Sequence, residues 1–122
     1  MKRFVLLTTI LTLLMATNVR AEVITKKCWA TAYCLTGTTA SGTQTTEDRT
    51  VAGKREWFGK KILIWLDDGD GAIKPENFIG QYIVEDTGGK SIRNGYVVDI
   101  YMPELEDCRQ FGGRRVIIQV FD

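Results

Sequence analysis

Two short runs of strand-forming residues, 81–84 and 96–102, are separated by a segment rich in turn residues. That segment contains the adjacent glycines Gly88 and Gly89 and an Asn-Gly step at residues 94–95. Paired glycines and Asn-Gly steps favour abrupt changes of chain direction. The pattern therefore predicts two strands with a sharp reversal between them, with Asp86 at the end of the first strand and Asp99 inside the second.

Asp99 is unusual because aspartate is disfavoured in the interior of a strand. Side chains alternate between the two faces of a strand, so Asp99 shares its face with Tyr101 and lies opposite Val98 and Ile100. Desolvation and a nearby second carboxylate both raise the pKa of a carboxyl group. We predict that Asp99 is a functional acid and Asp86 its neighbour. The alternatives are a turn or capping role for Asp86 and a paired or solvent-facing position for Asp99.

The N-terminal residues 1–21 have the pattern of a secretory signal peptide. Lys2 and Arg3 precede an apolar run over residues 4–15, and small residues near Ala21 follow it. A membrane anchor is the alternative, but the run is shorter than the ~20 residues needed to cross a bilayer. We expect cleavage after Ala21 to leave residues 22–122 as one domain without a membrane anchor, secreted or located in the cell wall or periplasm.

Charge and composition narrow the possible chemistry. The formal net charge of +1 gives no support for a nucleic-acid partner, which requires concentrated basic surface. The sequence has no histidine, which removes Ser-His and Cys-His nucleophile pairs and His-ligated metals. Proton transfer would therefore fall first to carboxylates. Residues 67–71 are acidic but fail the EF-hand spacing, so we predict a turn there and expect no metal or other cofactor.

Three cysteines remain after the predicted cleavage: Cys28, Cys34 and Cys108. If residues 28–34 form one strand, Cys28 and Cys34 lie roughly 20 Å apart, too far for a disulfide. A bridge would therefore join Cys108 to either Cys28 or Cys34. We expect the remaining cysteine to be a buried apolar residue.

Strand-like patterns recur along the whole domain, and the chain shows no internal repeat or linker. Strands are expected at residues 28–35, 50–52, 61–66, 79–85, 96–102 and 114–121, with a short helix at 103–111. We expect Trp29, Trp57 and Trp65 in the core or at its rim because aromatic side chains bury large areas. A small closed barrel is favoured over an open sheet because closure removes exposed strand edges.

Several motifs, in the same order along the chain, resemble the 3D (three-aspartate) domain. They are Thr31-Ala32-Tyr33, Thr39-Ala40-Ser41-Gly42, Arg49-Thr50-Val51-Ala52, Glu85-Asp86-Thr87-Gly88-Gly89, Val98-Asp99-Ile100-Tyr101 and Phe111-Gly112. That family is a double-psi β-barrel of cell-wall enzymes, including the catalytic core of membrane-bound lytic transglycosylase A and secreted stationary-phase and resuscitation-type wall proteins. The resemblance implies a mainly β fold, a small six-stranded double-psi β-barrel with one short helix before the last strand.

The resemblance also implies an activity, that of a peptidoglycan lytic transglycosylase. Such an enzyme cleaves the β-1,4 bond between MurNAc and GlcNAc and forms 1,6-anhydro-MurNAc with a single acid. Asp99 falls at the position of the catalytic acid and Asp86 at that of a second aspartate. The candidate substrate-binding residues are Thr31, Tyr33, Ser41, Thr50, Thr87, Gly88, Gly89 and Tyr101.

The sequence departs from the family at the first of its three aspartates. Residues 53–56 read Gly-Lys-Arg-Glu where the family has an aspartate after Thr-Val-Ala, and Glu56 or Asp48 is a candidate replacement. Two other functions therefore stay open, a hydrolytic endoglycanase on the same barrel and a non-catalytic, expansin-like glycan-binding wall module. In each case the expected partner is the glycan strand of peptidoglycan, and the domain is expected to be a monomer.

Overall fold

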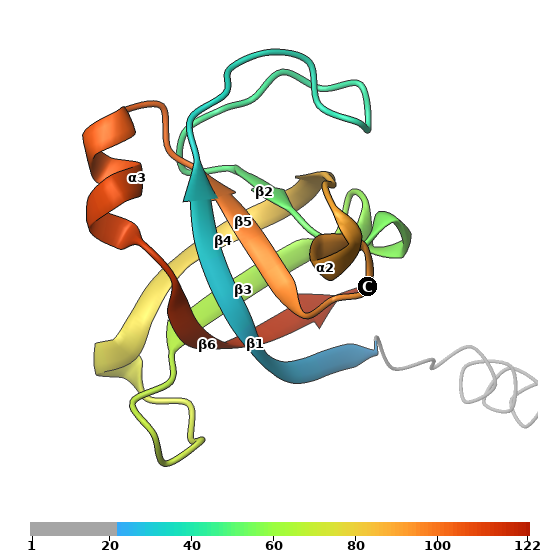
Figure 1. The fold of residues 1–122 in the computed structure, drawn as a ribbon. Coiled ribbons are helices and arrows are strands. Elements are labelled where there is room, and N and C mark those ends of the chain that lie inside the picture. Colours follow the sequence, from blue (N-terminus) through green and yellow to red (C-terminus); the bar gives the residue numbers. More distant parts are fainter. Residues whose placement is uncertain (1–21) are drawn as a thin grey trace, which may run out of the picture.

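A closed six-stranded barrel forms the body of the protein (Figure 1). The computed structural model describes residues 22–122, so the predicted signal peptide lies outside the described residues. The strands are β1 (Val23–Tyr33), β2 (Thr50–Ala52), β3 (Lys61–Leu66), β4 (Phe78–Asp86), β5 (Val97–Tyr101) and β6 (Arg114–Phe121). Around the barrel they follow the order β1-β5-β2-β4-β3-β6. The predicted six-stranded, mainly β fold is confirmed.

Helices are few and short. Helix α3 (Leu105–Phe111) precedes β6, as predicted, and begins two residues after Pro103. A second helix of one turn, α2 (Lys90–Arg93), lies in the glycine-rich segment and was not predicted. The 3-10 turns η1 (Arg55–Trp57) and η2 (Pro75–Asn77) complete the set. Within residues 22–122, no helix is long and apolar enough to cross a membrane.

The strand order separates β4 and β5, the two strands on either side of the glycine-rich segment. Strand β2 lies between them, paired parallel to β4 and antiparallel to β5. The chain therefore reverses direction between β4 and β5, as predicted, but the two strands are not neighbours. Strand β5 instead pairs with β1 in a second parallel ladder. A local sequence pattern does not predict which of several distant strands will pair.

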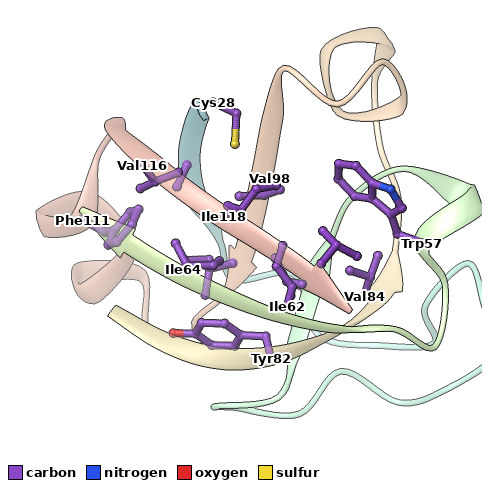
Figure 2. Close-up of a cluster of buried hydrophobic side chains, with 14 residues drawn as sticks. Cys28, Trp57, Ile62, Ile64, Tyr82, Val84, Val98, Phe111, Val116 and Ile118 are labelled. Carbon is purple, nitrogen blue, oxygen red and sulfur yellow. The ribbon is translucent and has the colours of Figure 1, made fainter. Parts of the chain in front are cut away.

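Alternate residues of each strand point into the barrel and form one apolar core (Figure 2). Cys28 and Ala30 enter it from β1, and Val98 and Ile100 from β5, where the predicted division of faces is confirmed. Trp57 is 3% exposed in this core. Trp29 departs from the expected core or rim position, because 47% of its surface is exposed on the outside of the barrel.

All three cysteines are free thiols, and they occupy different environments. Cys28 is the buried apolar cysteine, and burial raises the pKa of its thiol to about 11. The thiol of Cys34 interacts with that of Cys108, whose pKa is raised first by desolvation and then by this neighbour. The Cys108 thiol also donates a hydrogen bond to the Met102 carbonyl oxygen at 3.2 Å. Of the two pairings that the sequence left open, the structure therefore juxtaposes Cys34 with Cys108.

The acidic segment after β3 forms the predicted turn. Asp67 Oδ1 accepts hydrogen bonds from the backbone N–H groups of Gly69 and Gly71, at 3.0 and 3.2 Å. The Lys74 ammonium group pairs with the carboxylates of both Asp68 and Asp70. These carboxylates are therefore engaged by turn hydrogen bonds and by a lysine.

Candidate active site

Asp99 lies half-buried on the outer face of β5, opposite Thr31 in the β1–β5 ladder. The hydroxyl of Thr31 donates a hydrogen bond to Asp99 Oδ1 at 2.9 Å. Desolvation raises the pKa of the Asp99 carboxyl group, the Thr31 hydrogen bond offsets part of this rise, and the negative charge of Asp86 adds to it. The net pKa shift is upward, in the direction predicted from the sequence.

Asp86, the last residue of β4, is fixed by three hydrogen-bond donors. Its Oδ1 atom accepts from the backbone N–H groups of Ala40 and Thr87, at 3.0 and 2.9 Å. Its Oδ2 atom accepts from the Tyr33 hydroxyl at 3.0 Å. The carboxylate thus ties β4 to β1 and to the loop after β1, and it also caps the turn after β4.

Ala52 lies between the two aspartates. In the register of the sheet it is the partner of Asp86 on one side and of Asp99 on the other. Neighbouring strands are ~4.8 Å apart, so the Cα atoms of the two aspartates are separated by about 10 Å. Both carboxylates line a cavity of about 250 Å³ above the small Ala52 side chain. The lining residues are Tyr33, Leu35, Ala52, Asp86, Thr87, Gly88, Ile92 and Asp99.

An irregularity in the β2–β4 pairing brings Asp86 to this cavity. Tyr82 and Val84 point into the core, so strict alternation would place Asp86 inside the barrel as well. The register instead shifts between Val51 and Ala52, which pairs Val51 with Val84 but Ala52 with Asp86. A β-bulge changes the direction of the side chains that follow it. The shift therefore accounts for two acids from different strands lining one cavity.

Glu85, the residue skipped by this shift, forms a buried polar network that sequence reasoning missed. Its side chain is 3% exposed, and Oε1 accepts hydrogen bonds from the Thr50 hydroxyl at 3.0 Å and from Arg49 Nε at 3.2 Å. Thr50 is fully buried, and its hydroxyl also accepts the Thr46 N–H at 2.9 Å. Thr50 is therefore a structural residue and not the cleft hydroxyl that we predicted.

The two tyrosines predicted to bind substrate have different environments. Their rings make an edge contact with centroids 5.5 Å apart. Tyr33 is half-buried and lines the cavity, and desolvation together with Asp86 raises the pKa of its hydroxyl. Tyr101 is 4% exposed, and its hydroxyl is hydrogen-bonded to that of Thr36 at 2.5 Å. The Tyr101 ring is thus buried and is not the open sugar platform that we predicted.

The remaining candidates divide between the cavity and its surroundings. Thr87 and Gly88 line the cavity, and the buried Thr87 hydroxyl has no hydrogen-bond partner among residues 22–122. A Cβ atom on Gly88 would lie 2.7 Å from Ile92 Cδ1, the end of a flexible side chain that also lines the cavity. Gly89 caps α2, and Ser41 is exposed in the loop after β1, bonded to Thr39 at 3.2 Å. Neither Gly89 nor Ser41 lines the cavity.

Neither replacement considered for the missing aspartate lies at this cavity. The Glu56 side chain is 69% exposed and pairs with Lys54 at 3.0 Å. Asp48 has a φ of 61° and lies near Tyr82, whose hydroxyl pKa is raised first by desolvation and then by the charge of Asp48. Asp86 and Asp99 are therefore the two carboxylates that line the cavity.

A second cavity of about 230 Å³ adjoins the first and shares Tyr33, Leu35 and Asp86 with it. Leu35, at the junction, is 80% exposed. Sequence reasoning missed both Leu35 and Ile92. The one available signal was an apolar residue beside a turn, which is too common to single out a site.

Neither a family model nor a curated protein matches the sequence. Solved structures do match, among them crystal structures of MltA, a lytic transglycosylase from E. coli. Two of them are 22% identical to the chain, cover 70% of it and have TM-scores of 0.50 and 0.51. A third, a variant of MltA in an apo form, is 20% identical with a TM-score of 0.51.

The likeness concerns the barrel. The chain spans 27% of the length of the MltA structures it matches. At this level of identity the match shows a shared fold, so the protein has a barrel of the same fold as part of MltA. The fold relationship inferred from the aspartate motifs is therefore correct.

Proposed function

We propose that the protein is a peptidoglycan lytic transglycosylase with Asp99 as its acid and base. The supporting observation is the half-buried Asp99 carboxyl, with a raised pKa, in the wall of an open cavity. A carboxyl group that keeps its proton can protonate the glycosidic oxygen as the bond between MurNAc and GlcNAc breaks. The resulting carboxylate then accepts the proton of the MurNAc 6-hydroxyl as that oxygen attacks the anomeric carbon, giving the 1,6-anhydro ring.

The environment of Asp86 supports this reaction over hydrolysis. A hydrolase needs a second carboxylate that acts as nucleophile or activates water. Asp86 already accepts hydrogen bonds on both oxygens, from Tyr33, Ala40 and Thr87. It is therefore better suited to hold the site together and to act on Asp99 through its charge than to attack a substrate.

The absence of a third acid at the cavity favours the second candidate, a non-catalytic glycan-binding module. Such a module would use the same cavities without needing a proton-bearing group. The raised pKa of Asp99 is the feature that this candidate leaves without a role, and for that reason we place it second.

The substrate class follows from the same proposal. MltA is a lytic transglycosylase, and the barrel shares the fold of part of it. A wall substrate is also consistent with the export that residues 1–21 predict. We therefore propose that the protein acts on peptidoglycan outside the cytoplasm.

The proposal is tested by incubating the protein with purified sacculi and analysing the soluble products by mass. Anhydro-muropeptides are the expected product, whereas hydrated muropeptides indicate a hydrolase and pelleting without release indicates a binding module. Asp99→Asn should lower release by at least about 10²-fold, the lower end of what a general acid contributes. The control Glu56→Gln changes an exposed carboxylate outside the cavity and should leave release unchanged.

A further inference from the structure

The outer face of the β1–β5 ladder continues beyond the acid. Trp29 and Thr31 point to this face, whereas their neighbours Cys28 and Ala30 point into the core. Thr31 is hydrogen-bonded to Asp99, and Trp29 lies two residues before it, about 7 Å along the strand. Trp29 is 47% exposed. An exposed indole ring therefore lies on the same face as Asp99, two residues along β1 from the hydrogen-bond partner of Asp99.

Trp29 borders a cavity of about 410 Å³ that is separate from the aspartate cavity. The lining residues are Lys27, Cys28, Trp29, Asp67, Tyr96 and Arg115. Arg115 on β6 is the register partner of Trp29, and its guanidinium group lies 5.4 Å from the centre of the Trp29 ring. Tyr96 is 63% exposed, and its carbonyl oxygen accepts the Trp29 N–H at 3.0 Å. Two exposed aromatic rings and two basic side chains thus gather around one depression.

These groups match the chemistry of a sugar chain that carries carboxylates. An exposed indole offers a rigid apolar surface on which the C–H face of a pyranose ring can stack. Lys27 and Arg115 offer charge-assisted hydrogen bonds to carboxylates, and Asp67 offers an acceptor for sugar hydroxyls. An uncharged sugar would leave the two basic residues unused. A purely anionic ligand would leave the indole unused.

We propose that this cavity is an outlying subsite for the glycan strand, with one pyranose stacked on Trp29 and an attached carboxylate bound by Arg115 and Lys27. The inference rests on the proposed function, because it takes the glycan strand as the ligand of the whole face. Along the outer face of β1, Thr31 lies between Trp29 of this subsite and Tyr33 of the cavity that Asp99 lines. The subsite would therefore hold the strand along the ladder and present a neighbouring bond to Asp99.

The test is a pelleting titration with purified sacculi, performed in the Asp99→Asn background so that the glycan is not consumed. Trp29→Ala should raise the Kd for sacculi about tenfold, equivalent to ~1.4 kcal/mol. Phe78→Ala is the matched control, since Phe78 is an aromatic residue of nearly equal exposure, 48%, that packs against Trp65 on β3. An unchanged Kd for Trp29→Ala, or an equal loss in both variants, would overturn the subsite.

A second variant tests the carboxylate. Arg115→Gln should weaken binding at low salt and make the Kd less sensitive to salt, because screening acts on the charge that has been removed. An unaltered salt dependence would exclude the role of Arg115.

Product analysis of the parent protein separates the two proposals. If Trp29→Ala weakens pelleting but the parent releases no anhydro product, the proposed transglycosylase activity is wrong and the glycan subsite stands. If the parent releases anhydro product but Trp29→Ala pellets as before, the activity stands and the subsite is wrong.

Discussion

Thr31 and Asp99 face each other across the β1–β5 ladder, joined by a hydrogen bond of 2.9 Å from the threonine hydroxyl to Asp99 Oδ1. This bond favours the ionised carboxylate and so opposes the desolvation that raises the pKa of Asp99. Thr31→Val keeps the shape of the side chain and removes the donor. The pKa of Asp99 should rise further, and the alkaline limb of the pH profile of anhydro-muropeptide release should move to higher pH. An unchanged profile would mean that Asp99 is not the group that titrates.

Asp86→Asn should shift the same profile in the opposite direction. The charge of Asp86 helps to raise the pKa of Asp99, so a neutral side chain of the same size should lower that pKa. The alkaline limb should therefore move to lower pH. Both variants should be measured in the same buffers, so that the positions of their alkaline limbs can be compared directly. Parallel shifts in the two variants would contradict the electrostatic role assigned to Asp86.

Stability should depend on the protonation of Asp99. A carboxyl group with a raised folded-state pKa contributes stability that is present below its unfolded pKa, about 3.9, and is lost as the pH rises through the folded-state value. Asparagine does not titrate. The free energy of unfolding of Asp99→Asn, relative to the parent, should therefore increase between pH 3 and pH 7. Urea titrations at these pH values measure the difference, and a constant offset would mean that Asp99 is not desolvated.

Glu85→Ala should destabilise the fold without touching the cavity. The substitution leaves the buried Thr50 hydroxyl without its acceptor and removes the pairing with Arg49, whose own side chain is 57% exposed. Loss of a buried partner of this kind costs about 1–3 kcal/mol. Glu56→Ala breaks only the exposed pair with Lys54, which contributes at most about 1 kcal/mol. Equal losses in the two variants would show that the Glu85 network is not structural.

Cys34 and Cys108 should form a disulfide when the protein meets an oxidant. Their thiols already interact, whereas Cys28 lies in the core with a pKa of about 11. Exchange with glutathione disulfide would join the two sulfurs and release two molecules of glutathione. Thiol titration should then find one free cysteine per chain, and closure of so long a loop should stabilise the protein by about 4 kcal/mol. Cys34→Ser should prevent both effects. Three free thiols after oxidation would contradict the pairing.

The barrel was predictable because alternation of apolar and polar residues reports directly on which side chains a strand buries. Val98 and Ile100 enter the core as their spacing predicts, and Asp99 faces outward between them. The pairing of strands was not predictable in the same way. The insertion of β2 between β4 and β5 depends on contacts between segments remote in sequence, and the one-turn helix α2 arises within a segment whose glycines favour turns.

The site was predictable to the extent that its residues were locally unusual. An aspartate inside a strand is rare enough to single out Asp99, and the direction of its pKa shift follows from its apolar neighbours. Thr50 and Tyr101 were misplaced because the loop after β1 and the Glu85 network cover residues that face outward by alternation. The side-chain period cannot report such coverage, since it arises from tertiary packing.

Ala52 has one more consequence for the design of the site. The gap between Asp86 and Asp99 is the width of one intervening strand, so it is set by the rigid spacing of the sheet and not by any loop. Insertions or deletions at residues 36–48 or 89–95 could remodel the rim, and with it the choice of ligand, while the spacing of the two acids stays the same. The strands of the barrel thus fix the distance between the two acids, and the loops around the cavity can change without altering it.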